Sequence, residues 1–262
     1  MNSVLCRLAL TRTRIDAASF TAARLSCGAL VLALLISLSR KRRDGGQPSW
    51  ISAGALFAYA AAFSVAYLRL SAGVGALILF GAVQLSMTSW GVLRGERPTA
   101  VGWLGLALAV SGLVVLTLPG QAAPDVMSAS LMALSGVSWG IYSLRGRGQA
   151  NPTSTTAGNF IRSVPFVVVM WLVSPHASHP TEGLLLAALS GGLTSAGGYV
   201  LWYAALRGLL ATQASVVQLS VPVLTAALGV LLLGEHISLR LAAAGALILS
   251  GIALAIRSPQ RR

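Results

Sequence analysis

Apolar stretches long enough to cross a lipid bilayer recur along the whole 262-residue chain. A transmembrane helix needs about 20 mostly apolar residues. Nine segments meet this requirement: about 17–39, 50–68, 72–93, 100–118, 126–144, 156–173, 183–206, 209–233 and 239–256. The connectors are short and carry turn-forming and charged residues, so none can hold a soluble domain. The sequence therefore predicts an all-α integral membrane protein with nine transmembrane helices.

Charged residues are rare in these stretches. They make up 10% of the chain, against 55% hydrophobic residues, and all six carboxylates lie in connectors or at the ends of predicted helices. The cost of moving an ion into hydrocarbon requires this distribution. The net charge of +13 includes "RKRR" at 40–43, which directly follows a predicted helix and has no interleaved aromatic residues. Such a run is typical of a cytoplasmic anchor, so we expect the lipid bilayer as a partner and no nucleic acid.

No cluster of residues indicates catalysis or metal binding. "GVSWG" at 136–140 matches the G-x-S-x-G nucleophile elbow of serine hydrolases, but Ser138 lies inside a predicted membrane helix with no acid or histidine nearby in the sequence. We interpret it as a small-residue site for helix packing. "SPHASHPTE" at 174–182 has two histidines and a glutamate, but its prolines break the helix that would align them. The two cysteines, Cys6 and Cys27, have no metal-site spacing, so catalytic residues, metals and cofactors are not expected.

The chain matches itself after a shift of 138 residues. The shift pairs three arginines of the first half with three of the second: Arg7 with Arg145, Arg24 with Arg162 and Arg69 with Arg207. After one extra residue, "GVLRGE" at 91–96 aligns with "GVLLLGE" at 229–235. Self-similarity of this kind indicates two copies of one unit. We expect a first repeat over residues 1–120 and a second over residues 121–262.

The two copies are predicted to lie in opposite orientations. The second holds five predicted helices, an odd number, and inverted repeats are typical of secondary transporters. The first holds four, because the counterpart of 126–144 would begin before Met1 and leave only the tail "MNSVLCR". A real nine-helix protein is one interpretation, and a ten-helix protein with its start site placed too late is favoured. With a cytoplasmic C-terminus, twelve Lys and Arg residues lie inside and five outside, which satisfies the positive-inside rule.

These features resemble the EamA-type, ten-helix members of the drug/metabolite transporter superfamily. The resemblance rests on the two units, on Trp139-Gly140, on the Gly-Glu pairs at 95–96 and 234–235, and on Pro222. The chain departs from the pattern in its first helix, and Gln84 stands where the repeat would place a second proline. The resemblance implies a carrier of the bacterial inner membrane, commonly an exporter of amino acids, related metabolites or drugs, with a central cavity and alternating access. A membrane-embedded structural or assembly protein and a lipid-processing enzyme remain the alternatives.

Two arginines inside predicted helices are the first candidates for the substrate pathway. A charged side chain within a span is costly unless it faces a cavity or a partner. Arg24 and Arg162 each lie about two turns into a helix, and Asn159 shares the helix face of Arg162. The guanidinium suits a carboxylate or a phosphate, which would favour a carboxylate-bearing substrate. The alternative is that the long side chains reach the lipid headgroups.

Amide and aromatic side chains are the other candidates. Gln84 and Gln218 lie well inside predicted helices, while Tyr199, Tyr203 and Trp139 offer aromatic faces. Each has helix packing or an interfacial position as its alternative. Glutamates at the ends of predicted helices are expected to cap or anchor them, with proton coupling as the alternative. Substrate identity, transport direction, the coupling ion and the oligomeric state stay open, and a monomer is compatible with the sequence.

Overall fold

In the computed structural model, every regular element among the described residues is a helix. The described residues are 1–38, 46–93, 95, 99–118, 123–146, 149, 151–175, 180–199, 201 and 211–257, with side chains described except in 211–220 and 255–257. In chain order the elements are α1 (Asn2–Arg12), α2 (Ala17–Leu38), α3 (Trp50–Ala66), α4 (Ala72–Leu93), α5 (Ala100–Thr117), α6 (Val126–Gly146), α7 (Pro152–Val173), α8 (Thr181–Ala188), the π-helix η1 (Leu189–Gly197), α10 (Ala211–Leu233) and α11 (Leu239–Arg257). The predicted all-α fold is confirmed.

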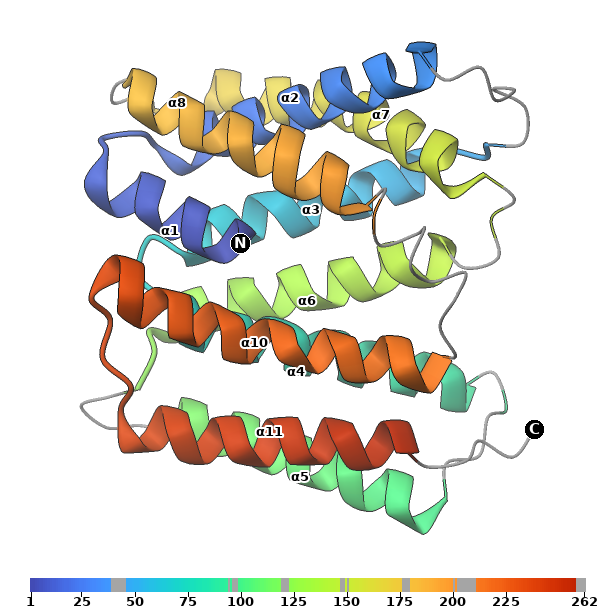
Figure 1. The fold of residues 1–262 in the computed structure, drawn as a ribbon, viewed down its shortest axis with the longest axis vertical. Coiled ribbons are helices and arrows are strands. Elements are labelled where there is room, and N and C mark those ends of the chain that lie inside the picture. Colours follow the sequence, from blue (N-terminus) through green and yellow to red (C-terminus); the bar gives the residue numbers. More distant parts are fainter. Residues whose placement is uncertain are drawn as a thin grey trace.

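Each predicted membrane segment coincides with a described helix, wholly or in part. Among the described residues, α2, α4, α5 and α7 have the length and hydropathy to cross a membrane, and α3 is apolar but shorter. Residues 2–12 form one helix more than the nine predicted: α1 runs beyond the expected tail "MNSVLCR" and begins halfway along the bundle (Figure 1). Helix α7 begins at Pro152, before the apolar stretch, because the Asn151 side chain accepts a hydrogen bond from the Ser154 amide at 3.2 Å.

Short polar side chains define where the helices begin. The side-chain caps are Asp16 for α2, Ser49 for α3, Thr99 for α5, Asp125 for α6, Asn151 for α7 and Ser238 for α11. Hydrogen bonds from the Ser128 hydroxyl and amide hold the pKa of the Asp125 carboxyl below its usual range. These caps satisfy amides that the helices themselves leave without partners.

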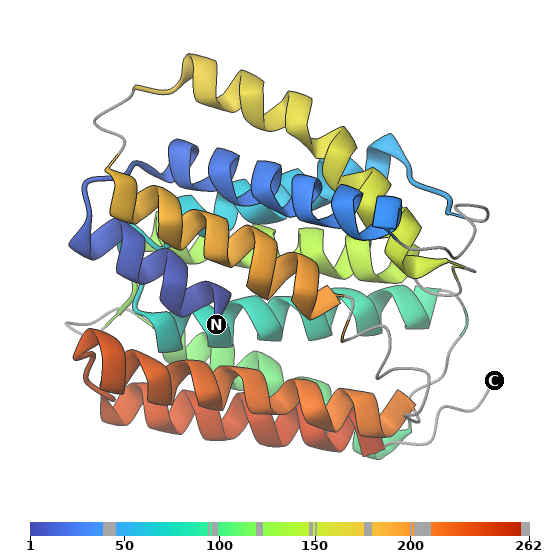
Figure 2. The same ribbon diagram turned by 45° about the horizontal axis from the view of Figure 1, so that its top comes forward.

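The helices run side by side, and their connections alternate between the two ends of the bundle. In Figure 1 the turns from α3 to α4 and from α10 to α11 lie at the left end, while α7 begins and α11 ends at the right. Helices α5 and α11 pack along each other, α4 packs against α6 and α10, and α2 packs against α7 and η1. Figure 2 shows the same neighbours from a second direction. Each long helix is therefore fixed by partners distant in the sequence.

Glycines let several of these helices approach until their backbones touch. A Cβ atom on Gly251 of α11 would lie 2.5 Å from the Gly105 carbonyl oxygen of α5, and one on Gly136 of α6 would lie 2.5 Å from the Leu79 carbonyl oxygen of α4. Gly140 likewise faces Ser86 of α4. The "GVSWG" motif is thus an α6–α4 packing surface, and Ser138, 6% exposed, sits within a helix with no strand before it. The interpretation as a packing site is confirmed.

A glycine with positive φ follows the end of α4 and of α10. Gly95 has φ +89° and Gly234 has φ +69°, values that residues with a Cβ adopt only with strain. The Gly234 amide donates to the Val230 carbonyl at 3.2 Å, which is the left-handed way to end a helix. The first residue of each Gly-Glu pair is therefore explained by backbone geometry.

Replacing Gly234 with alanine should lower the free energy of unfolding by about 1 kcal/mol, because alanine is strained at positive φ. Gly54→Ala is the matched control, since Gly54 lies inside α3 and a Cβ there would meet no atom within 4 Å. The melting temperature of the detergent-purified protein measures both changes. Equal melting temperatures for Gly234→Ala and wild type would contradict this account of the helix end.

Cysteine labelling tests the arrangement of the two ends. In a background with Cys6 and Cys27 replaced by alanine, a membrane-impermeant maleimide added to intact cells should label Thr181→Cys and His236→Cys. Gln47→Cys and Gln149→Cys, at the opposite end, should react only after the membrane is opened. Labelling of Gln47→Cys and Thr181→Cys from the same side would contradict the fold, whereas a consistent reversal would contradict only the orientation.

Candidate functional site

The most deeply buried charge in the described part of the chain is Arg24, on α2. Its side chain is 2% exposed, and it alone among the described charged residues is buried. Ten residues of α2, including this one, face the interior of the bundle. Burial of an ion costs several kcal/mol, on the order of the total stability of many domains, unless charges and hydrogen bonds compensate for lost water. The surroundings of Arg24 therefore decide what this position can do.

Arg24 lies against a group of aromatic rings that come from four parts of the fold. We call them the aromatic cluster: Tyr59 and Phe63 of α3, Tyr67 just after α3, Trp139 and Tyr142 of α6, Phe160 of α7, and Tyr199 just after η1. Neighbouring ring centroids are 4.7 to 6.2 Å apart, for example 4.9 Å between Tyr59 and Trp139. Each ring contacts at least one other, and together the rings form one continuous chain of contacts. Separations and tilted orientations of this kind are favourable for aromatic pairs.

The guanidinium of Arg24 makes one hydrogen bond within this cluster. Its Nη2 donates to the Tyr59 hydroxyl at 3.1 Å, and its central carbon lies 5.4 Å from the Tyr59 ring centroid and 5.0 Å from that of Phe63. The Nε and Nη1 atoms are buried and have no hydrogen-bond partner among the described residues. Cation–π contacts offset part of the lost hydration, but two charged donors are left free to bind an acceptor.

No carboxylate among the described residues neutralises Arg24. Asp16 and Asp125 cap their own helices, Glu182 is exposed in the first turn of α8, and Glu235 binds elsewhere. The remaining acids, Asp44 and Glu96, lie outside the described residues. The buried cation is thus without a counterion in the described part of the protein.

Backbone contact between α2 and η1 holds Arg24 in place. A Cβ on Gly191 would collide with the Arg24 carbonyl oxygen, and one on Gly28 would lie 2.6 Å from the Phe160 ring. The π-helix has a wider turn than an α-helix and is uncommon outside functional regions. Here Gly191 of the π-helix packs directly against the turn of the α2 backbone that carries Arg24.

The structure separates the two arginines that the repeat relates. Arg162 is half-buried, its Nη1 donates to the Gly158 carbonyl at 3.3 Å, and its guanidinium lies 6.0 Å from the Trp50 ring centroid. The Asn159 side chain is buried, and its Oδ1 accepts a hydrogen bond from the Ser49 amide at 2.9 Å. The side chains of Arg162 and Asn159 therefore connect α7 to the start of α3, because the chain entering α3 packs over this face of α7.

The other predicted site residues fall into three groups. Trp139 and Tyr199 belong to the aromatic cluster, with ring centroids 5.3 Å apart. Gln84 is half-buried in α4 and donates to Thr88 of the same helix at 3.4 Å. Tyr203 and the side chain of Gln218 lie outside the described residues, as do both histidines of the 174–182 stretch. Where side chains are described, no three His, Cys, Asp or Glu residues gather as metal ligands.

Most of the aromatic cluster was not predicted. Tyr59, Phe63 and Tyr67 recur every fourth residue, which places them on one helix face, and this spacing was the available signal. Nothing in the sequence joins that face to Phe160 or Tyr142.

A pocket of about 260 Å³, lined by apolar residues and by Ser19 and Ser26, lies between α2, α7 and α8, and Arg24 does not line it.

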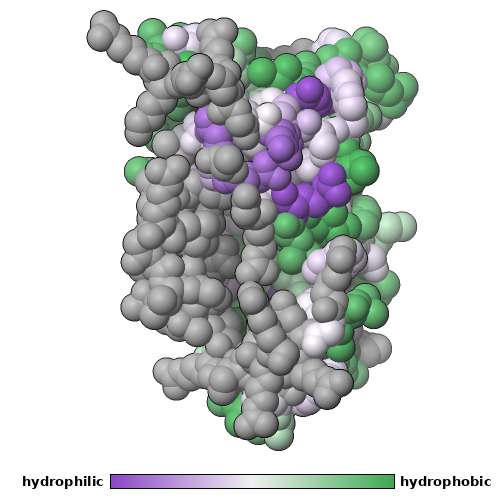
Figure 3. Space-filling model, turned by 90° about the vertical axis from the view of Figure 1, so that its right-hand side faces the viewer, coloured by the Kyte–Doolittle hydropathy of each residue, from purple (hydrophilic) through white to green (hydrophobic). Residues whose placement is uncertain are grey.

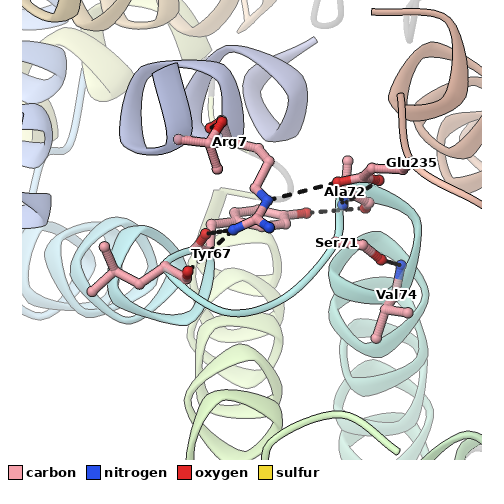
Figure 4. A network of polar contacts seen from close by, with 8 residues as sticks. Arg7, Tyr67, Ser71, Ala72, Val74 and Glu235 are labelled. Atoms are coloured by element: carbon pink, nitrogen blue, oxygen red, sulfur yellow. Dashed lines mark hydrogen bonds and ion pairs between the residues drawn. The ribbon is translucent and has the colours of Figure 1, made fainter. Parts of the chain in front are cut away.

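A second, partly buried polar arrangement joins α1, the start of α4 and the segment just after α10 at one end of the bundle. Figure 4 shows Arg7 between the Tyr67 backbone and Glu235. Arg7 donates to the Tyr67 carbonyl at 2.8 Å and lies 3.7 Å from the Glu235 carboxylate, which accepts from the Ala72 amide at 2.8 Å. Glu235 thus caps the N-terminus of α4, a helix distant in the sequence. Glu235 therefore does cap a helix end, but that of α4 and not that of the helix it follows in the sequence.

The opposite end of the bundle is polar where α6 ends and α7 begins. Figure 3 shows hydrophilic side chains gathered in the upper half of this end, beside hydrophobic ones. Arg145 donates to Ser49 at 3.2 Å, and Thr155 accepts from the Gln47 amide at 3.0 Å. These contacts tie the starts of α3 and α7 together.

Gly191→Ala should abolish most activity and lower the melting temperature, because the new methyl group would displace the α2 backbone at Arg24. Gly192→Ala is the matched control, since its Cβ would meet only a Val31 methyl group at 3.1 Å. Thermal unfolding and transport measured on both variants check the prediction. Equal behaviour of the two variants would contradict the role assigned to the α2–η1 contact.

Comparison with known proteins agrees with this architecture. Residues 126–257 match the EamA-like transporter family. An uncharacterized protein of Pseudomonas aeruginosa is 51% identical, over 97% of this chain and 88% of its own. The uncharacterized transporter YwfM of Bacillus subtilis is 25% identical, over 93% of this chain and 86% of its own. A protein of known crystal structure has the same fold, with a TM-score of 0.67, 22% identity, and coverage of 97% of this chain and 93% of its own. The chain therefore belongs to the EamA-like transporter family, and this membership points to a membrane transporter and not to an enzyme.

Proposed function

We propose that the protein is a secondary transporter that exports a small carboxylate-bearing molecule, such as an amino acid, a related metabolite or a drug. The observation that carries the proposal is Arg24, whose Nε and Nη1 donors are buried and free inside the aromatic cluster. A guanidinium presents parallel N–H donors that match a carboxylate. The surrounding ring faces suit the apolar part of such a molecule.

Alternating access between two inverted repeats, residues 1–120 and 121–262, is the proposed mechanism. Three helices of the first half pack against the helices at equivalent positions of the second: α2 with α7, α4 with α10, and α5 with α11. Both α4 and α10 end at a glycine with positive φ that precedes a glutamate. Inverted repeats of this kind move one half against the other around a central site.

The proposed setting is the bacterial inner membrane, with a cytoplasmic C-terminus. The excess of Lys and Arg in the connectors on that side supports this orientation. One chain supplies Arg24 and every ring of the aromatic cluster. A monomer is therefore sufficient for the proposed site.

Arg24→Gln should reduce efflux of carboxylate-bearing substrates about ten- to a hundredfold, because hydrogen bonds to charged groups contribute about 1.5 to 3 kcal/mol. Arg24→Lys should restore only part, since it loses the planar fork. The assay is efflux of a panel of labelled amino acids from proteoliposomes with equal amounts of protein. The melting temperature of Arg24→Gln should not fall, because the variant removes a charge without a counterion.

Arg162→Gln is the matched control, since the repeat relates it to Arg24 but Trp50 and the Gly158 carbonyl are its neighbours. We expect near-normal efflux from this variant. Normal efflux from Arg24→Gln at native abundance would overturn the proposed site, and a large loss in Arg162→Gln would extend the site to α7.

A further inference from the structure

We infer that the transporter is an obligatory exchanger, which moves its site across the membrane only when an anion occupies Arg24. This inference rests on the proposed function and adds to it the return step. Export of one carboxylate would then be followed by import of another small anion through the same site. The counter-anion is defined by its chemistry, as a second carboxylate or an inorganic anion.

The first step of the argument is the state of Arg24 when the bundle is closed around it. With 2% of its side chain exposed, the guanidinium has lost nearly all contact with water. It keeps its proton in proteins, and Tyr59 satisfies only one of its nitrogen atoms. A closed, empty site therefore holds an uncompensated charge in a medium of low dielectric constant, which is strongly unfavourable.

The second step is that the described residues, and the stretch 183–234 as a whole, supply no counterion at this position. The sequence contains no Asp or Glu between residues 183 and 234, so the undescribed residues 202–210 and side chains 211–220 cannot provide one. Glu235 is engaged by the Ala72 amide and by Arg7. Asp16 is engaged by Ser19.

The third step compares Arg24 with a cation that needs no ligand. Arg7 is also partly buried, with 21% of its side chain exposed, but Glu235 lies 3.7 Å away, and the Tyr67 and Leu68 carbonyls accept its hydrogen bonds. The partly buried Arg7, which has a structural role, therefore has a counterion from the chain. Around Arg24 the described residues provide aromatic rings and one hydroxyl, so in this inference the anion comes from outside.

The consequence concerns the conformational change itself. When the site is open to one side, water hydrates Arg24, and the empty state is tolerable. Closing the site removes that water, so closure is favourable only with an anion in place. An exporter that has released its substrate outside then returns with another anion. Exchange of two solutes with the same net charge moves no net charge, so its rate should not depend on the membrane potential, whereas exchange of a zwitterionic amino acid for chloride moves one negative charge.

The test uses proteoliposomes of phosphatidylethanolamine and phosphatidylglycerol, loaded separately with tritium-labelled L-leucine, L-phenylalanine or L-glutamate. Efflux is measured into a chloride-free MES buffer, into the same buffer with chloride, and into the same buffer with the unlabelled amino acid. We expect at least tenfold faster efflux when the unlabelled amino acid or chloride is outside. Stimulation by chloride alone identifies the counter-anion as inorganic, whereas stimulation by the amino acid alone identifies it as a carboxylate.

Leucinamide outside is the matched control for L-leucine, because it lacks the carboxylate, and it should not stimulate efflux. In Arg24→Gln the residual efflux should lose its dependence on the external anion, so that the stimulation ratio falls to about one. Arg162→Gln should keep the ratio. Equal efflux into all media in the wild-type protein overturns obligatory exchange while leaving the proposed function intact. Absence of protein-dependent movement of all three amino acids under every condition overturns the proposed function as well.

Discussion

The hydrocarbon interior of a membrane offers no hydrogen-bond partner and no hydration to a charge, and the whole structure follows from this. Backbone groups are satisfied inside helices, and the amides at helix starts are satisfied by short side chains such as Asp125 and Asn151. Even Glu235 is used in this way, on the N-terminus of α4. Charges in the described part of the chain therefore gather towards the ends of the bundle, and Arg24 is the one described charged residue that is buried in its interior.

Arg24 is held where it is by close packing of backbones. Gly191 leaves no room for a side chain against the carbonyl of Arg24, and Gly28 gives the Phe160 ring its place against α2. With small residues at these contacts, helices approach closely enough for van der Waals attraction to fix them without a hydrophobic driving force. The same device joins α6 to α4 through Gly136 and Gly140, so a pattern that resembles a hydrolase motif has a purely structural explanation.

Two arginines that occupy equivalent sequence positions have taken different roles. Arg24 points into the aromatic cluster, whereas Arg162 lies beside Trp50 at the start of α3. The difference arises because each helix of a pair meets different neighbours: α2 faces η1 and α3, while α7 is covered by the chain that enters α3 near Ser49. An internal sequence match therefore does not imply an equivalent environment.

The sequence by itself determined the helices, their approximate bounds and the exclusion of acids from the spans, because these depend on local hydropathy and on the length needed to cross a bilayer. It also singled out Arg24, since any charge within an apolar helix is conspicuous. The sequence pattern did not predict that α1 extends to Arg12 or that α7 begins at Pro152, because capping rather than hydropathy sets these two bounds. Only the tertiary structure decided that Tyr59, which contacts Arg24, belongs to one ring cluster with Trp139 and Phe160, while Arg162 lies elsewhere. The physical reason is that lipid-facing and interior faces of these helices are similarly apolar, so contacts between distant helices, and not the pattern along each one, choose which face turns inward.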